Sequence, residues 1–406
     1  MPPLKQILSD LTALVSYVAI TPIARLIPKH PASVIIFAPE NGGFSDNAKY
    51  AYLALTEDQR FNVTYILYDD TIAKALRDAG INALAYPSLA AVWTMLRARV
   101  AVGVALFPFR RTLGRWTAGA KKVQLWHGSG VKNIGLGNPT NVKRSESRYY
   151  RFKWAIDRMH PTFDLLFLPS NQLRKWRGHS FRSNDIVING LLRNDLLFGR
   201  SFGGREQLFC DTQVGSQIAQ KKAAGKRIIL YAPTFRSRSQ QIFERLVPFD
   251  FDWFNLYSRH NNAALVIKLH PHMPDTLDLR LYENIIEYDR KLDIYPYLSN
   301  FDLMITDFSS FATDFALTGK PIMRYVPDYA RWERSGRISA SSSAELPGEL
   351  FQTFDKMSEA LTSKFPSESY SASAFHDFTD DQSCNRFVSK IEELLKLSGD
   401  VQRSHD

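Results

Sequence analysis

The sequence contains little cysteine, no long apolar run and no dinucleotide-binding fingerprint. Its only cysteines, Cys210 and Cys384, cannot form a disulfide framework and lack the spacing of metal ligands. A reducing cytoplasm therefore fits best. Glycine-rich segments occur, but none has the GxGxxG spacing of a dinucleotide-binding loop. No cluster of His, Cys and Asp demands a metal ion, so we expect neither a metal nor another cofactor.

Acidic residues are the minority among the charges, because 41 Asp and Glu stand against 51 Lys and Arg and the net charge is +10. This excess predicts a polyanionic partner: nucleic acid, anionic lipid, a phosphate-rich polymer or a nucleotide-linked substrate. Basic and aromatic residues are interleaved from Lys143 to Arg182. Such a stretch can bind nucleic acid, but it matches no nucleic-acid module. A membrane interface or a polyphosphate acceptor is therefore favoured.

The most apolar segment near the N-terminus runs from Leu11 to Ala24 and contains Pro22. It is shorter than the roughly 18 residues that a membrane-spanning helix needs. It also lacks the basic start and the cleavage site of a signal peptide. Two interpretations remain open: an interfacial helix that anchors the chain to a membrane, and a buried helix that packs on the first domain.

Short continuous apolar runs alternate with helical patterns along the chain. Such runs are typical of parallel strands that are buried on both faces, and the alternation predicts doubly wound α/β architecture. We expect two Rossmann-like lobes that face each other across a cleft. The predicted divisions are an N-terminal helix (1–30), a first lobe (31–205), a second lobe (206–383), and a C-terminal helix with its tail (384–406). Each predicted strand lies within one of the clearest apolar runs, at 33–39, 62–68, 100–107, 122–128, 164–170, 227–234, 263–271, 284–288, 303–310 and 321–327.

Polar residues that directly follow these strands are the candidate site residues, because ligands bind at the carboxyl ends of strands in open α/β sheets. The strongest segment spans 305–321, where a strand leads to Asp307, and Ser309 and Ser310 then open a helix that ends at Gly319. Free amide groups and two hydroxyls at a helix start favour a pyrophosphate. Ordinary helix capping is the alternative.

Two further segments of the second lobe could also meet phosphates. His270 follows a strand, with Lys268 just before it. Thr234, Arg236 and Arg238 follow the first strand of this lobe, and guanidinium groups match phosphate geometry. A solvated basic loop is the alternative for this second segment.

In the first lobe, His127 follows a strand on a glycine-containing turn, which suits a general base facing the cleft. We place Lys132, five residues further on, on the acceptor side. The glycine-rich loop at 40–50 enters a helix and offers Gly43, Asp46 and Asn47 as acceptor-side candidates.

The segment FDFDW (249–253) contains a DxD pattern that resembles the metal-binding element of some sugar-nucleotide transferases. It lies at a predicted helix start rather than at a strand end. We therefore expect these acids to cap the helix.

Taken together, the segments resemble the CDP-glycerol glycerophosphotransferase family, which includes teichoic-acid primases, polymerases and related capsule enzymes. Each segment alone is weak, but all of them in the same order form a specific signal that covers roughly Glu40 to Arg386. The matching pieces are GGFSDNAKY, QLWHGSGVK, NGLLRNDLLF, YAPTFR, KLHP, LMITDFSSFATDFALTGKPI and, more loosely, PDYARWERSGR and LPGEL.

The resemblance implies a GT-B-like fold with the donor mostly on the C-terminal lobe, no metal site, and a peripheral location at the cytoplasmic face of the membrane. It makes His127 the catalytic histidine and His270 the second essential one. It places the donor phosphates on Arg236, Ser309 and Ser310. Thr234 and Lys268 are further donor-side candidates. Asp314 is implied to bond ribose or glycerol hydroxyls.

The implied reaction is transfer of glycerol phosphate from CDP-glycerol to a hydroxyl of a membrane-associated polymer, with release of CMP. The sequence has Ser-Gly at 129–130 where many members have Thr-Pro, and it diverges most at 327–337, which leaves the polyol and the acceptor open. Its length favours a primase-like or capsule-type enzyme. The alternatives are a GT-B glycosyltransferase with a UDP- or CMP-sugar donor and a non-catalytic polyanion- or membrane-binding protein.

Overall fold

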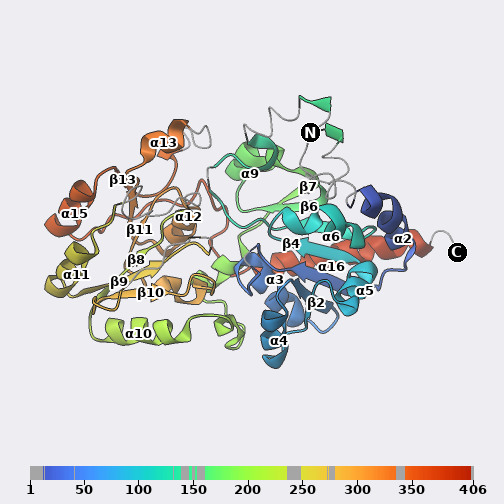
Figure 1. Cartoon of the computed structure of the whole chain (residues 1–406), viewed down its shortest axis with the longest axis horizontal. Coiled ribbons are helices and arrows are strands. Elements are labelled where there is room, and N and C mark those ends of the chain that lie inside the picture. The colour runs from blue at the N-terminus through green and yellow to red at the C-terminus, as the bar shows by residue number, and fades with distance from the viewer. Residues whose placement is uncertain are drawn as a thin grey trace.

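The apolar runs of the sequence form two parallel β-sheets, and these make up two lobes that lie side by side (Figure 1). In the computed structural model, every strand pairing in the described part of the chain is parallel. The two-lobed α/β fold predicted from the sequence is therefore confirmed. The structure describes residues 12, 14–40, 42–130, 132–138, 146–148, 151–152, 161–235, 248–271, 273, 279–334 and 343–403.

The first lobe contains a seven-stranded sheet, counted over the described residues, with the order β3-β2-β1-β4-β5-β6-β7. Its interior strand β1 is buried along its whole length because helices cover both faces of the sheet. The strands are β1 (Ser33–Phe37), β2 (Asn62–Leu67), β3 (Ala83–Ala85), β4 (Val100–Gly103), β5 (Lys121–Gln124), β6 (Thr162–Leu168) and β7 (Arg182–Ile188).

The second lobe contains a six-stranded sheet, again counted over the described residues, with the order β10-β9-β8-β11-β12-β13. In both lobes the chain order reverses beside the first strand of the sheet, which is where a doubly wound fold opens a crevice for ligands. The strands are β8 (Arg227–Tyr231), β9 (Ala263–Lys268), β10 (Ile285–Tyr288), β11 (Leu303–Thr306), β12 (Ile322–Tyr325) and β13 (Glu349–Phe351).

Successive strand residues point to opposite faces, so each sheet supports two cores. In β1, Val34 and Ile36 join one core of the first lobe, while Ile35 and Phe37 join the other. In β8, Ile229 joins one core of the second lobe and Ile228 joins the other. These apolar faces explain why the strands read as continuous rather than alternating apolar runs.

The helices begin at the polar residues that follow the strands. The Asp69 carboxylate accepts hydrogen bonds from the first turn of α4, and the Ser170 hydroxyl does the same for α9. The helices are α2 (Thr21–Leu26), α3 (Asp46–Thr56), α4 (Asp70–Asp78), α5 (Leu89–Arg97), α6 (Arg111–Trp116), α9 (Asn171–Arg177), α10 (Thr212–Ala223), α11 (Phe251–His260), α12 (Phe311–Phe315), α13 (Tyr329–Arg334), α15 (Phe354–Ser363) and α16 (Ser383–Arg403).

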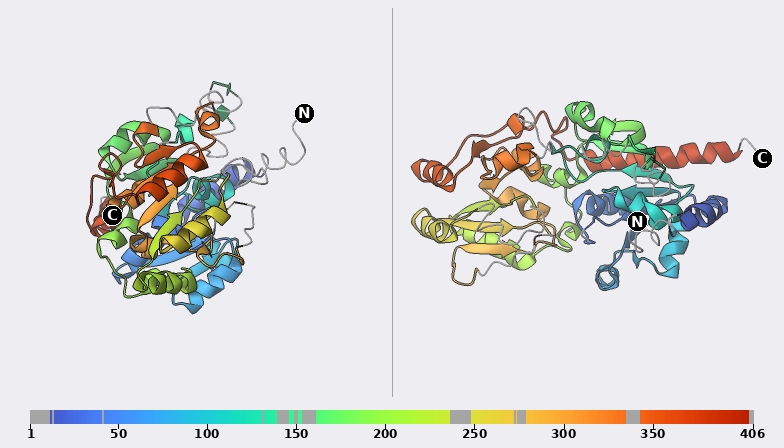
Figure 2. Two further views of the ribbon diagram at one scale, coloured as in Figure 1. Left: turned by 90° about the vertical axis from the view of Figure 1, so that its left-hand side faces the viewer. Right: turned by 45° about the horizontal axis from the view of Figure 1, so that its top comes forward.

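The C-terminal helix α16 belongs to the core of the first lobe although it follows the second lobe in sequence. Cys384, Phe387, Ile391 and Leu394 pack against the strands and α3 of the first lobe. Figure 2 shows the helix extending across that lobe to the C-terminus. The chain therefore crosses between the lobes twice, and α16 ties the end of the second lobe to the first.

The N-terminal helical segment packs on the first lobe with one side only. It consists of the π-helical turn Ser16–Ile20, which continues into α2. Ala24 is buried against Leu96 and Ala118, whereas the side chains of Val18 and Leu26 are 65% and 82% exposed. Within the described ranges, no helix combines the length and apolar character that a membrane crossing requires.

A buried ion pair joins the two lobes behind the cleft. Lys49 of α3 donates to Asp293 of the second lobe at 2.9 Å, and both side chains are almost completely buried. The Tyr50 hydroxyl donates to the same carboxylate at 2.6 Å. Lys49 Nζ also lies 3.6 Å from the sulfur of Cys210, and burial raises the pKa of this thiol to about 12. Both cysteines are free thiols, as the sequence predicted.

We predict that Asp293→Ala destabilises the protein, because it leaves the buried Lys49 charge without its partner. The expected loss is about 3–5 kcal/mol of unfolding free energy, measured by chemical denaturation. Asp78→Ala is the matched control, since it breaks the exposed Lys74–Asp78 pair and should cause no resolvable change. Equal effects of the two substitutions would contradict the prediction.

Candidate active site

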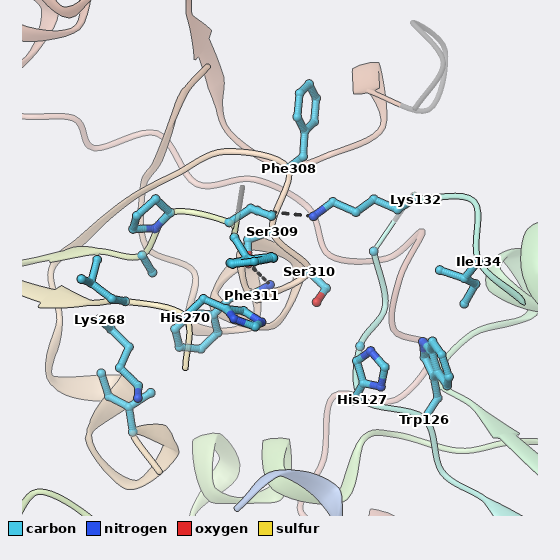
Figure 3. Close-up of a pocket in the computed structure, with 18 of the residues that line it drawn as sticks. Trp126, His127, Lys132, Ile134, Lys268, His270, Phe308, Ser309, Ser310 and Phe311 are labelled. Atoms are coloured by element: carbon cyan, nitrogen blue, oxygen red, sulfur yellow. Dashed lines mark hydrogen bonds between the residues drawn. The ribbon is translucent and has the colours of Figure 1, made fainter. Parts of the chain in front are cut away.

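A cavity of about 470 Å³ lies between the lobes, at the carboxyl ends of β5 in the first lobe and of β8, β9 and β11 in the second. It is lined by His127, His270, Ser309 and Ser310, among others. Figure 3 shows the two histidines reaching from opposite sides toward the serine pair. The structure thus brings together residues from three segments that lie far apart in the sequence.

His127 stands on a tight turn after β5. The preceding Trp126 has a left-handed backbone, with a φ of 54°, which is uncommon for a bulky residue and characteristic of functional sites. The Trp126 ring also packs against the imidazole, with 4.1 Å between ring centroids. His127 Nδ1 lies 2.9 Å from the carbonyl oxygen of Val104. A proton on Nδ1 satisfies this contact, and in the neutral ring it leaves Nε2 as a proton acceptor.

The loop after His127 lies directly against the second lobe. A Cβ atom added to Gly128 would stand 2.4 Å from the Ser310 hydroxyl oxygen, and one added to Gly130 would stand 3.1 Å from Ser310 Cβ. A side chain at Gly128 would clash with Ser310 and one at Gly130 would crowd it, so the two glycines let the His127 loop come this close to the serine pair.

The serine pair begins α12, as the sequence predicted. The Phe311 amide donates to the Ser309 hydroxyl at 3.2 Å, and the Thr313 hydroxyl donates to the Ser310 carbonyl at 2.6 Å. The predicted helix length needs correction. Only Phe311–Phe315 is α-helical, and a 3₁₀ turn, Ala316–Thr318, leads to Gly319 with a φ of 68°. The tighter last turn and the left-handed glycine end the helix.

Asp307 organises the loop that follows β8. It is buried and accepts hydrogen bonds from both the backbone amide and the hydroxyl of Thr234. Lys132 of the first lobe donates to the same hydroxyl at 3.4 Å and lies over the ring of Trp332. Lys132 and Thr234, predicted for the acceptor and donor sides respectively, therefore meet across the cleft.

Lys268 is the last residue of β9 and His270 follows the strand, and both line the cavity. The His270 ring packs against Phe235 at 5.3 Å. The Lys268 ammonium donates to the Asp289 carbonyl at 2.8 Å, and burial lowers the pKa of this amine to about 7. Of this pair, the imidazole of His270 is the group placed beside the serine pair.

Several predicted residues lie behind the cavity lining rather than in it. Gly43 is buried, and its carbonyl accepts from Tyr65; Asn47 donates to the Trp126 carbonyl at 3.0 Å. Asp46, which has a φ of 60°, accepts from Arg193. Asn47, directly, and Asp46, through Arg193, thus support the His127 loop from behind.

Asp314 is completely buried, and its carboxylate accepts hydrogen bonds from Arg193 and Tyr295. Burial alone would raise the pKa of Asp314, but the charge of Arg193 and the contacts with His376 and Tyr295 outweigh it and lower the pKa. The predicted contacts of Asp314 with ribose or glycerol hydroxyls therefore require a carboxylate that already has protein partners.

Two remaining predictions concern residues 236–252. Arg236 and Arg238 lie outside the described residues. In the DxD segment, Asp250 caps α11 by accepting from the Trp253 amide at 2.8 Å, and Asp252 accepts from Tyr282. The expected capping role of Asp250 is confirmed.

Sequence reasoning missed Arg193, Tyr295 and Trp332. Tyr295 and Trp332 line the cavity, and Arg193 contacts the carbonyl of His127. Arg193 belongs to the NGLLRNDLLF segment, which matched the family pattern without receiving a role. Tyr295 follows no predicted strand, and Trp332 lies on α13 in the most divergent segment, so neither carried a positional signal.

The two parallel-sheet lobes and the cavity between them define a GT-B-like fold. The chain belongs to the CDP-glycerol:poly(glycerophosphate) glycerophosphotransferase family, whose model matches residues 20–393. The family expected from the sequence motifs is thereby confirmed.

Among similar proteins, the teichoic acid glycerol-phosphate primase of Bacillus subtilis is 23% identical over 87% of this chain and 90% of that protein. A teichoic acid poly(glycerol phosphate) polymerase of Bacillus spizizenii is 25% identical over 92% of this chain and 94% of that protein. The ribitol-phosphate polymerase TarL of Staphylococcus aureus is 24% identical, over 61% of this chain but only 42% of its own length.

Among solved structures, a variant of the wall teichoic acid polymerase TagF soaked with CDPG has a TM-score of 0.66 and 18% identity, over 97% of this chain and 96% of that one. The Staphylococcus aureus protein MnaA with UDP has a TM-score of 0.51 and 14% identity, over 91% and 98% of the two chains. At these identities the likeness shows the fold.

We predict that Gly128→Ala lowers turnover about 100-fold, because the added methyl group pushes the His127 loop away from Ser310 and displacements near 1 Å can have effects of this size. Steady-state kinetics checks this. Gly178→Ala is the control, since a Cβ at that position meets only side-chain atoms, Ile186 Cδ1 at 3.3 Å and Arg174 Cγ at 3.9 Å. Normal turnover in Gly128→Ala would show that the close approach is unnecessary.

Proposed function

We propose that this chain transfers glycerol phosphate from CDP-glycerol to a hydroxyl group of a teichoic-acid-type polymer and releases CMP. Membership of the glycerophosphotransferase family supports the reaction class. The observation that carries the proposal is the convergence of His127, His270, Ser309 and Ser310 on one cavity between the lobes. A base on one wall and hydroxyl, amide and imidazole donors on the other suit transfer of a charged phosphoryl group.

In the proposed reaction, the donor pyrophosphate lies at the start of α12. The Ser309 and Ser310 hydroxyls and the amide groups of the first turn donate to it, and His270 adds a further donor. Because α12 has only five residues, these local donors carry more of the interaction than a long helix dipole does. Positively charged groups that approach the cleft, such as Lys132, add to the attraction for the donor.

The proposed chemical step begins at Nε2 of His127, which takes the proton from the acceptor hydroxyl. The acceptor oxygen then forms a bond to the β-phosphorus of CDP-glycerol, and the bond from that phosphorus to the bridging oxygen breaks. CMP leaves with the electron pair, and the proton remains on the imidazole until it exchanges with solvent. Ser309, Ser310 and His270 stabilise the charge that develops on the transferred phosphoryl group and on CMP.

We predict that His127→Asn strongly lowers the rate at which CMP is released from CDP-glycerol in the presence of an acceptor. A positioned general base contributes about 10²–10⁴-fold, so the decrease should fall in that range. His260→Asn is the matched control, because this histidine lies at the exposed end of α11 and should have normal turnover. CMP release by a folded His127→Asn variant at the wild-type rate would remove the base from the mechanism.

The same assay separates the possible donors. CMP formed from CDP-glycerol and an acceptor supports the proposal. If CDP-ribitol is consumed and CDP-glycerol is not, the transferred group is ribitol phosphate. Turnover of a UDP-sugar alone would make the chain a glycosyltransferase. Binding of polymer without consumption of any donor would identify a non-catalytic member of the family.

We further propose that the enzyme works at the cytoplasmic membrane face and attaches there through its N-terminal helical segment. One side of the segment packs on the first lobe, while Leu14, Val15, Val18, Ile23 and Leu26 point to solvent. An apolar face on a surface helix of a basic protein fits the interface of an anionic bilayer.

We predict that the double substitution Val18→Ser and Leu26→Ser weakens sedimentation with phosphatidylglycerol vesicles at least about tenfold, since each buried side chain can contribute about 1.5–3 kcal/mol. Leu281→Ser is the control, because this side chain is at least as exposed but lies on the second lobe. If the double variant partitions like the wild type, this segment does not anchor the enzyme.

A further inference from the structure

Arg193 is a buried cation that lies between the two lobes, behind the cavity. It belongs to the 3₁₀ turn Leu192–Phe198 that follows β7, and its side chain is only 4% exposed. The guanidinium packs over the ring of Tyr295, 4.7 Å from the centroid. A charge that is removed from water in this way requires several well-placed partners.

One group of partners lies on the donor-side helix of the second lobe. Arg193 Nε and Nη2 donate to Oδ2 of Asp314, at 3.2 and 2.6 Å. Asp314 is the fourth residue of α12, the helix that starts immediately after Ser309 and Ser310. The Tyr295 hydroxyl donates to the same oxygen at 2.6 Å, and His376 Nε2 lies 3.3 Å from the other carboxylate oxygen. This network fixes the guanidinium relative to the serine pair.

The other partners lie around His127 in the first lobe. Arg193 Nη1 donates to the carbonyl oxygen of His127 itself at 3.1 Å, and also to the carboxylate of Asp46. Asn47 holds the neighbouring carbonyl, that of Trp126, at 3.0 Å and accepts from the Arg193 backbone amide at 3.3 Å. Two successive carbonyl groups on the His127 turn are therefore held from behind.

The backbone around the first-lobe partners of Arg193 has unusual dihedral angles. Asp46 and Trp126 both have left-handed φ values, of 60° and 54°, although neither is glycine. Such conformations persist where surrounding contacts over-determine them. Arg193 contacts Asp46 directly and His127, the residue after Trp126, through its carbonyl. Next to them, the Ser129 and Thr313 hydroxyls are hydrogen-bonded to each other across the lobes.

From these contacts we propose that Arg193 is a positioning residue, which sets the place of the His127 imidazole relative to the donor phosphates bound at Ser309 and Ser310. This inference rests on the proposed function. Arg193 does not itself reach the lining of the cavity in the described part of the chain, so it acts through His127 and Asp314. The planar guanidinium of Arg193 contacts both residues: Nη1 donates to the His127 carbonyl, and Nε and Nη2 donate to Asp314.

Lysine cannot replace this arrangement. Its ammonium group is a point charge on a flexible stem, whereas arginine offers donors in a fixed planar fork. Arg193→Lys therefore keeps a positive charge opposite Asp314, but it cannot also donate a hydrogen bond to the His127 carbonyl. We expect the turn to relax and His127 Nδ1 to leave the Val104 carbonyl for part of the time.

The test compares Arg193→Lys with Asp195→Asn, a substitution two residues away in the same segment. Asp195 is also buried, but it accepts from the Ser383 and Cys384 amides at the start of α16, outside the cavity. Three quantities are measured on each protein: kcat for CMP release, the Kd for CDP-glycerol, and the tautomer of His127. The tautomer comes from ¹⁵N spectra of histidine-labelled protein with neutral imidazoles, assigned with His127→Asn.

For Arg193→Lys we expect kcat to fall about 100-fold while the Kd stays within about threefold of wild type, since misplacement of a base affects the chemical step. The His127 spectrum should change from one tautomer to a mixture. Asp195→Asn should lower the melting temperature but keep the wild-type tautomer and kcat. Asp46→Asn, which weakens one partner only, should give the same pattern as Arg193→Lys with a smaller decrease, and it serves if the lysine variant does not fold.

The proposal is overturned if the kcat of Arg193→Lys stays within about threefold of wild type. It is also overturned if kcat falls while the tautomer is unchanged, because the arginine then acts on something other than His127. A wild-type enzyme that releases no CMP from CDP-glycerol contradicts the proposed function instead. In that case the tautomer comparison still tests the positioning role, since it needs no substrate.

Discussion

The structure depends on the closed contact between the His127 loop of the first lobe and the serine pair of the second. Gly128 and Gly130 allow the loop to lie against Ser310, but their lack of side chains also means that they do not hold it there. Buried charges behind the cleft supply that hold. Lys49 with Asp293 and Arg193 with Asp314 each join a residue of the first lobe to one of the second. The cavity is therefore bounded by two elements whose separation is fixed by ion pairs outside it.

In this arrangement, one layer of residues lines the cavity and a second layer behind it holds the first in place. The cavity lining contains imidazole and hydroxyl groups, which can exchange protons and hydrogen bonds with a substrate. The two ion pairs behind it are almost completely buried, and their charged groups are already paired with one another. Removing one member of such a pair costs more than the pair contributes to stability, because a buried charge is left without a partner. Because a buried ion pair is costly to break, it is suited to fixing the distance between the His127 loop and the serine pair.

The sequence predicted those parts of the site that depend on local pattern. His270 and Ser309 each follow a largely apolar strand, and His127 follows β5, whose second half is buried. The carboxyl ends of parallel strands meet at one edge of a sheet. Strand β7 escaped prediction because it forms the edge of its sheet and begins with the polar residues Arg182 and Ser183. Its burial pattern lacks the continuous apolar character of the central strands.

The role of Asp314 could not be predicted from its position on the helix after the serine pair. Nearness to a phosphate site suggested contact with the substrate, but its partner Arg193 lies in the other lobe, 121 residues away in sequence. No local periodicity reports a partner at that distance. The same holds for Asp46 and Asn47, which the glycine-rich loop placed on the acceptor side and the structure places against Arg193 and Trp126. Contacts between residues far apart in the sequence are the part of this site that only the folded chain reveals.

The most direct test of the account is a crystal structure of the His127→Asn variant with CDP-glycerol. The account predicts the pyrophosphate within hydrogen-bonding distance of Ser309, Ser310 and His270, with the side chain at position 127 facing the β-phosphorus from the first lobe. A donor bound with its phosphates elsewhere, or with residue 127 turned away from the β-phosphorus, would contradict it.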